Sequence, residues 1–126
     1  MAQHNQLGQL GEEAARDFLI ARGLTIREQN WRMNKLELDL VAHDPKSNVL
    51  HIVEVKTRTS DAHYDPMQSI TRQKKRNLVA AANAYVRYYQ LKCSVVYDVM
   101  LVVGPPGAFR IQSIPRAFQP ELRSYR

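Results

Sequence analysis

Residues 36–42 read LELDLVA, and residues 49–57 read VLHIVEVKT. The first stretch alternates leucine with other residues, and the second is rich in Val and Ile, which favour β-strands. Between them, residues 43–48 read HDPKSN, whose Asp-Pro and Ser-Asn pairs are typical of turns. The two stretches therefore predict a β-hairpin. In its first strand, alternation assigns one face to Leu36, Leu38 and Leu40 and the other to Glu37, Asp39 and Val41.

Two acidic residues lie in this hairpin among apolar neighbours. Asp39 is flanked by leucines, and Glu54 stands between Val53 and Val55. An ionised carboxylate is rarely buried unless it is paired or bound to a metal. A turn centred near residue 46 sets Asp39 almost opposite Val53 and Glu54, where Cβ atoms lie roughly 4.5–5.5 Å apart. Two carboxylates at that spacing repel each other strongly unless a cation lies between them.

Lys56 lies two residues beyond Glu54, on the same face of the strand. One lysine beside Asp39, Glu54 and Glu37 leaves net negative charge, which Mg²⁺ (or Mn²⁺) would balance. The pattern is what a metal-dependent phosphodiesterase needs: Asp39 and Glu54 hold a metal that activates water, and Lys56 stabilises developing charge or orients the water. The alternative is an ion pair between Glu54 and Lys56 on a solvated face, and the residues alone leave both open.

Outward from the hairpin, periodic apolar residues predict helices over 6–22 and 71–90 and strands over 24–31, 95–103 and 109–114. The order α-β-β-β-α-β-β indicates an α/β sandwich with a mixed sheet. At 126 residues, the chain is expected to form a single domain, with 116–126 as a basic C-terminal tail. Glu12, on the flank of the first predicted helix, is a candidate third acid of the site, or else a solvated residue near the helix start.

Positive charge collects in the second half of the chain. Residues 1–63 carry 8 Lys and Arg against 9 Asp and Glu, whereas residues 64–126 carry 10 against 3, so the net charges are −1 and +7. This imbalance favours a polyanionic partner, nucleic acid first, although solubility alone would also explain it. Four basic residues lie at the start of the second predicted helix: Arg72, Lys74, Lys75 and Arg76. They could bind a phosphate group, or they could simply form a solvent-exposed basic face.

Composition excludes several other classes. The single cysteine allows no disulfide within the chain and no cysteine-based zinc site. No apolar run approaches the ~18 residues of a membrane span, and residues 1–6 lack the features of a signal peptide. We therefore expect a cytoplasmic protein with no membrane partner.

Six short motifs, in order along the chain, resemble those of one family. They are Gly8-Gln9-Leu10-Gly11-Glu12 with Ala15, Asn30-Trp31-Arg32, Glu37-Leu38-Asp39-Leu40-Val41, Glu54-Val55-Lys56-Thr57-Arg58, Lys74 with Ala81 and Ala82, and Tyr97-Asp98-Val99. On these residues the chain resembles the YraN-like family of small uncharacterised bacterial proteins, which is assigned to the restriction-endonuclease-like (PD-(D/E)XK nuclease) superfamily. It departs from the family pattern at Leu36 and Tyr64-Asp65-Pro66, which lack the usual glycines, and at Lys75, often glutamine.

The resemblance implies a restriction-endonuclease-like core, with a mixed central β-sheet flanked by helices. It implies catalytic positions at Asp39, Glu54 and Lys56, with Glu12 where related Holliday-junction resolvases carry a helical glutamate and Glu37 as site support. The resemblance implies a Mg²⁺-dependent DNA endonuclease that is resolvase-like or acts on branched DNA in repair or recombination, and it allows a homodimer. Arg58 would then join the four helical basic residues in binding DNA. The alternatives are a nucleic-acid-binding module that no longer cuts and an interaction protein with structural ion pairs.

Overall fold

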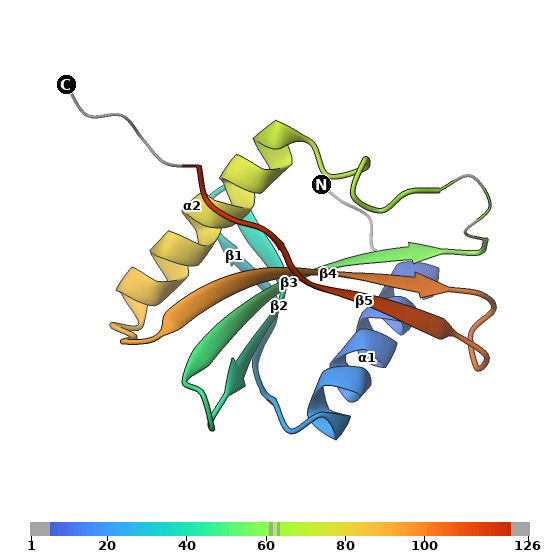
Figure 1. Cartoon of the computed structure of the whole chain (residues 1–126), viewed down its shortest axis with the longest axis horizontal. Helices are drawn as coiled ribbons and strands as arrows, with labels where there is room; N and C mark the ends of the chain where they lie inside the picture. Colours follow the sequence, from blue (N-terminus) through green and yellow to red (C-terminus); the bar gives the residue numbers. More distant parts are fainter. Residues whose placement is uncertain (1–5, 61, 63, 122–126) are drawn as a thin grey trace.

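The computed structural model describes residues 6–60, 62 and 64–121 and places seven regular elements in them (Figure 1). In chain order they are α1 (Gln6–Ala21), β1 (Thr25–Met33), β2 (Leu36–Asp44), β3 (Val49–Arg58), α2 (Arg72–Tyr88), β4 (Ser94–Val103) and β5 (Arg110–Phe118). The predicted order is confirmed. The last strand ends four residues later than predicted, so residues 116–118 of the expected tail belong to the sheet, and residues 122–126 of that tail lie outside the described residues.

The five strands form one mixed sheet in the order β1-β2-β3-β4-β5. Only β3 and β4 pair in parallel, and the other three neighbouring pairs are antiparallel. Parallel neighbours need a long crossover, which α2 and its flanking segments supply. The mixed α/β class and the mixed sheet are therefore confirmed.

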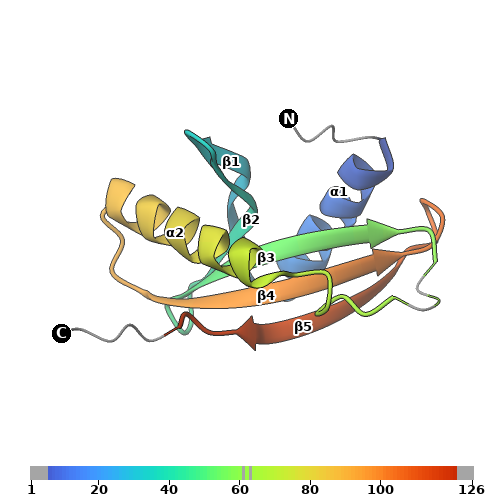
Figure 2. The same ribbon diagram turned by 90° about the horizontal axis from the view of Figure 1, so that it is seen from above.

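The two helices cover opposite faces of this sheet. Leu78 of α2 packs in one apolar cluster with Val41 and Ile52, whereas Leu19 of α1 packs in a second cluster with Leu40 and Val53. Consecutive strand residues point to opposite faces, so each cluster lies on its own face. Figure 2 shows the β1–β2 hairpin standing between the two helices. In the described part of the chain, neither helix is long and apolar enough to cross a membrane.

The prediction that Leu36, Leu38 and Leu40 share one face of β2 is wrong. Leu36 and Leu38 pack with the α2 cluster, whereas Leu40 packs with the α1 cluster. The change of face falls at Asp39, because the β2–β3 ladder ends at the pair Leu40–Val53 and the outer part of β2 pairs with β1 alone. Asn30 of β1, beside this point, has a left-handed backbone with a φ of 55°. The hairpin thus bends toward α2 at the acidic residue.

Candidate active site

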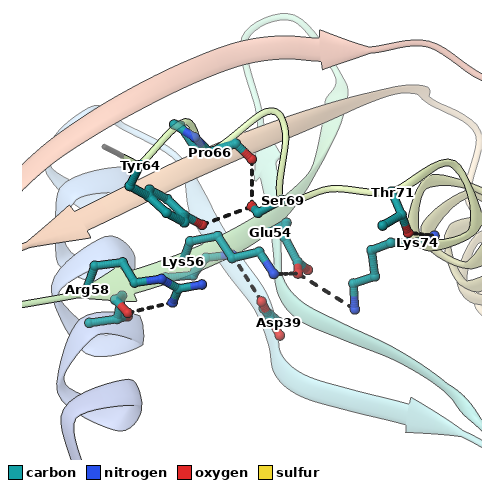
Figure 3. Close-up of polar contacts among 11 residues, drawn as sticks. Asp39, Glu54, Lys56, Arg58, Tyr64, Pro66, Ser69, Thr71 and Lys74 are labelled. Atoms are coloured by element: carbon teal, nitrogen blue, oxygen red, sulfur yellow. Dashed lines mark hydrogen bonds and ion pairs between the residues drawn. The ribbon is translucent and has the colours of Figure 1, made fainter. Parts of the chain in front are cut away.

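Asp39 and Glu54 come together where the β2–β3 ladder ends. Leu40 pairs with Val53, so one further step along the two strands brings the two acidic residues side by side, as the predicted hairpin register required. The Asp39 side chain also closes the ladder, because the backbone N–H of Val55 donates to its Oδ2 at 3.0 Å (Figure 3). This hydrogen bond fixes the Asp39 carboxylate against β3.

Glu54 is held between two lysines. Its side chain is 5 % exposed, and its Oε2 lies 3.3 Å from Nζ of Lys56 and 3.7 Å from Nζ of Lys74. Lys56 comes from the same strand, whereas Lys74 reaches in from the first turn of α2 (Figure 3). Lys74 was predicted to bind phosphate, and the structure places it in direct contact with the proposed metal ligand. Two ammonium groups therefore converge on the buried carboxylate.

The environment of Asp39 favours its protonated form. Burial raises the pKa of the Asp39 carboxyl well above its usual range, and the charge of Glu54 raises it further. The hydrogen bond from Val55 lowers this pKa, and the charge of Glu12 adds a smaller rise. Crowded carboxylates of this kind gain from a bound cation, because a cation removes both the repulsion and the proton.

Glu12 reaches this region because α1 lies very close to β3. A Cβ atom on Gly11 would overlap the Thr57 side chain, with Thr57 Cγ2 only 2.6 Å away. Glycine at this position lets the helix backbone approach the strand. The neighbouring Glu12 is 5 % exposed and acts electrostatically on Asp39. The helical glutamate thus borders the carboxylate pair.

The donor set suits Mg²⁺ with a small number of protein ligands. Within the described ranges, no three acidic, histidine or cysteine side chains stand close enough to form a ready-made metal site. Mg²⁺, however, is commonly bound through one or two carboxylates, with water and substrate phosphate completing its coordination. Asp39 and Glu54 meet that requirement. They are therefore the residues that would hold the ion, with Glu12 as a neighbouring charge.

The residues of the predicted basic cluster point to different sides of α2, because successive residues of a helix are rotated about its axis. Lys74 faces Glu54, whereas Arg72 and Arg76 contact Glu121 near the C-terminal end of the described chain. Lys75 lies over the ring of Phe118, with its Nζ 5.7 Å from the ring centroid. Four residues that are neighbours in sequence therefore serve two different surfaces.

The two remaining candidates lie at the edges of the site. Arg58 donates to the backbone oxygen of Thr57 at 2.7 Å, and its guanidinium lies 4.7 Å from the ring centroid of Tyr64. Glu37 forms an ion pair of 2.9 Å with Arg32 of β1. Glu37 is thus held in an ion pair across the β1–β2 hairpin. Arg58 is the last residue of β3, two residues beyond Lys56.

Sequence reasoning missed two polar contributions near the site. Thr71 caps α2, because its Oγ1 accepts a hydrogen bond of 3.1 Å from the backbone N–H of Lys74. In the preceding loop, Tyr64 donates to Ser69 and Ser69 donates to the carbonyl of Pro66, at 2.9 and 2.7 Å (Figure 3). Threonine before a helical stretch is a recognisable cap signal, whereas nothing in the sequence indicates the loop contacts.

Asp98, a buried residue of β4, has a structural role. Its Oδ2 lies 2.7 Å from Nδ1 of His51, and its Oδ1 accepts the backbone N–H of Arg116 at 2.9 Å. The β4–β5 register shifts at this point, between Tyr97 and Val99. Asp98 therefore fastens β5 to β4 at an irregularity of the sheet.

Fold and site together define a small mixed α/β protein with two adjacent carboxylates, Glu54 buried and Asp39 half-buried, and two lysines where the β2–β3 ladder ends. The chain belongs to the family described as "Uncharacterised protein family UPF0102", whose model matches residues 11–102. This range includes Glu12, Asp39, Glu54, Lys56 and Lys74, and it ends before β5. The predicted membership of a YraN-like uncharacterised family is therefore confirmed as far as the family itself.

Relatives in the same family cover nearly the whole chain. A UPF0102 protein of Bacteroides fragilis is 44% identical over 122 residues, which are 97% of this chain and 99% of the relative. A UPF0102 protein of Bacteroides thetaiotaomicron is 43% identical with the same coverage. Among solved structures, a protein of unknown function from Silicibacter pomeroyi is similar at a TM-score of 0.41 and 18% identity, covering 96% of this chain and 78% of that one.

Proposed function

We propose that this protein is a Mg²⁺-dependent DNA endonuclease with a restriction-endonuclease-like core, acting on branched DNA in repair or recombination. One observation carries the proposal: Asp39 and Glu54 stand side by side at a break in the sheet, with two lysines on Glu54. This combination of acidic and ammonium groups suits the hydrolysis of a phosphodiester, whose reaction needs an activated water and stabilisation of added negative charge.

Each residue has a role in this mechanism. Asp39 and Glu54 would hold Mg²⁺, which supplies an activated water and neutralises charge on the scissile phosphate. Val55, through its backbone N–H, keeps the Asp39 carboxylate oriented. Lys56 and Lys74 lie 3.3 and 3.7 Å from Glu54 Oε2, and in this mechanism their ammonium groups would stabilise negative charge that develops beside Glu54.

The charge distribution supports DNA as the partner. Residues 64–126 carry a net charge of +7 by composition, and α2 places basic residues both toward the carboxylates and toward the C-terminal segment. The proposal includes action in the cytoplasm. It also includes a homodimer, because two active sites in one assembly can cut both strands of a duplex or junction in one binding event.

A cleavage assay tests this function. Linear duplex, single-stranded, flap and four-way-junction DNA would each be incubated with Mg²⁺, Mn²⁺ or EDTA. We expect metal-dependent cutting by the wild type and at least a 100-fold loss in Asp39→Asn, the scale at which a group acting on transition-state charge contributes. Asp44→Asn removes a carboxylate from the exposed end of the same strand and should cut normally. Equal cutting by wild type and Asp39→Asn would refute the proposed roles.

A second candidate is a nucleic-acid-binding module that does not cut. It is favoured by the ion pairs of Lys56 and Lys74, which already neutralise Glu54, and by the lack of a three-ligand group among the described residues. It predicts salt-dependent DNA binding without turnover. Binding that Mg²⁺ leaves unchanged, with no cleavage of any of the four substrates, would favour this module over the enzyme.

A further inference from the structure

A basic groove runs along the side of α2 that faces away from Lys74. It has a volume of about 990 Å³, and most of its lining residues belong to α2 and to the end of β5 with the segment that follows it. Figure 1 shows the course of α2 and of this segment. Four of its lining residues are cationic, and among its described lining residues only Glu121 is acidic; the cationic ones are Arg72, Lys75, Arg76 and Arg87. Such a surface is complementary to a polyanion.

The Glu121 carboxylate is bound at one end of this groove by two arginines from successive turns of α2. Arg72 donates to it through Nη2 at 2.6 Å and through Nε at 3.1 Å, and Nε of Arg76 lies 3.5 Å away. The hydrogen bond from Arg72 lowers the pKa of the Glu121 carboxyl, so this group stays ionised at neutral pH. Guanidinium groups bind carboxylate and phosphate in the same forked geometry.

These ion pairs are exposed and therefore exchangeable. The side chains of Arg72, Arg76 and Glu121 are 72, 56 and 52 % exposed. Exposed pairs contribute little to stability, and salt or a competing anion weakens them. A nucleic-acid backbone, which offers several phosphates at once, would displace a single carboxylate from the two arginines.

We propose that the groove between α2 and residues 118–121 is a second binding surface for the DNA backbone, and that Glu121 occupies a phosphate position in the free protein. This inference rests on the proposed function, because it concerns the same substrate. DNA that reaches both Lys74 and this groove passes across the N-terminal end of α2, so the groove would hold backbone distant from the scissile bond. Displacement of Glu121 is then part of substrate binding.

The test is DNA binding in EDTA, measured by fluorescence anisotropy on the substrate that the wild type binds most tightly. Glu121→Gln should tighten binding about 2–5-fold, the range that release of an exposed ion pair allows. The matched control is Asp17→Asn, which also removes one exposed carboxylate, on the opposite face of the sheet. In an Arg72→Gln/Arg76→Gln background, Glu121→Gln should have no further effect, because its partners are gone.

The groove itself is tested through salt dependence. Arg87→Gln should reduce the slope of log affinity against log salt by about 1, as expected for one lost phosphate contact. Arg16→Gln, which removes an exposed charge from α1, should leave the slope unchanged. The inference is wrong if Glu121→Gln behaves like Asp17→Asn, if its effect persists in the double background, or if Arg87→Gln behaves like Arg16→Gln.

The outcomes separate this inference from the proposed function. If the groove variants behave as expected but no DNA is cut, the groove stands and the protein is the binding module. If Asp39→Asn abolishes cutting while the groove variants have no effect, the nuclease stands and the groove is wrong. If the wild type binds none of the DNA substrates, both are wrong.

Discussion

Asp39 is the residue on which the account depends most, and its raised pKa has a consequence for stability. A carboxyl group whose pKa is higher in the folded protein than in the unfolded chain makes the folded state hold more protons. Stability then falls as pH rises from the unfolded pKa through the folded one. Without metal, the raised pKa of Asp39 therefore lowers the stability of the protein at pH values above the pKa that this carboxyl has in the unfolded chain.

Asp39→Asn should relieve this strain, because asparagine keeps an oxygen that can accept the Val55 N–H. In EDTA, we expect the variant to be more stable than the wild type at pH 8 and the difference to shrink as pH falls toward 4. The gain is about 1.4 kcal/mol for each unit by which the pKa of Asp39 is raised. Urea denaturation across this pH range measures it.

Asp44 provides a control of opposite sign on the same strand. Hydrogen bonds from Lys46 and Ser47 lower the pKa of the Asp44 carboxyl, so its ionised form favours the folded state. Asp44→Asn should therefore give no gain at pH 8. A pH profile in which Asp39→Asn and Asp44→Asn coincide would show that the carboxylate pair carries no electrostatic strain.

Lys56 gives a prediction about catalysis as distinct from metal binding. Lys56→Gln removes one of two ammonium groups on Glu54, so cleavage should fall roughly 100-fold, as when one transition-state donor is lost. Mg²⁺ should bind at least as tightly, because a competing cation has gone. Initial rates and Mg²⁺ titrations check this, with Lys46→Gln in the exposed β2–β3 turn as control. A parallel loss of Mg²⁺ affinity would contradict the assigned role.

At the residue scale, the sequence predicted the acidic pair but not its full surroundings. Hairpin register follows from a short turn, so Asp39 and Glu54 could be paired from the sequence. A long crossover connection separates Lys74 from Glu54 in the sequence. Unlike a short hairpin turn, such a connection does not determine which residues at its two ends come into contact. Its contact with Glu54 therefore required the structure.

At the scale of elements, the order of helices and strands was predictable, but the face to which each side chain points was less so. Hydrophobic periodicity indicated each helix and strand, but strict alternation along β2 failed at Asp39, where the strand changes face. Periodicity assumes a regular ladder, and this ladder ends at Leu40–Val53. The adjacent basic residues of α2 likewise diverge, because successive residues of a helix are about 100° apart. The deviation in β2 falls at the proposed metal site.

The contact between α1 and β3 should control both stability and the position of Glu12. Gly11→Ala introduces a Cβ that overlaps Thr57, so we expect a loss of roughly 1–3 kcal/mol, typical of overpacking. Combining it with Thr57→Ala removes the nearest side-chain atoms and should recover part of that loss. Denaturant unfolding of the two single variants and the double variant measures the coupling. Strict additivity would mean that the two residues do not meet.

At the scale of the whole molecule, charge and topology act together. The basic second half of the chain comprises α2, β4 and β5, and α2 carries that charge to the edge of the acidic site built by β2 and β3. Composition revealed the imbalance, but only the fold shows which basic residues face the carboxylates and which face the C-terminal segment. The family to which the chain belongs was also recognisable from its motifs, since they span most of the sequence.

The proposed mechanism requires that Asp39 and Glu54 form a binding site for a divalent cation. Calorimetric titration of the protein with Mg²⁺, in buffers of different ionisation enthalpy, tests it most directly. We expect saturable binding, with proton release at any pH low enough for the raised pKa of Asp39 to leave its carboxyl protonated. Binding should be lost in Asp39→Asn and kept in Asp44→Asn. No binding to the wild type, or equal binding to Asp39→Asn, would contradict the account.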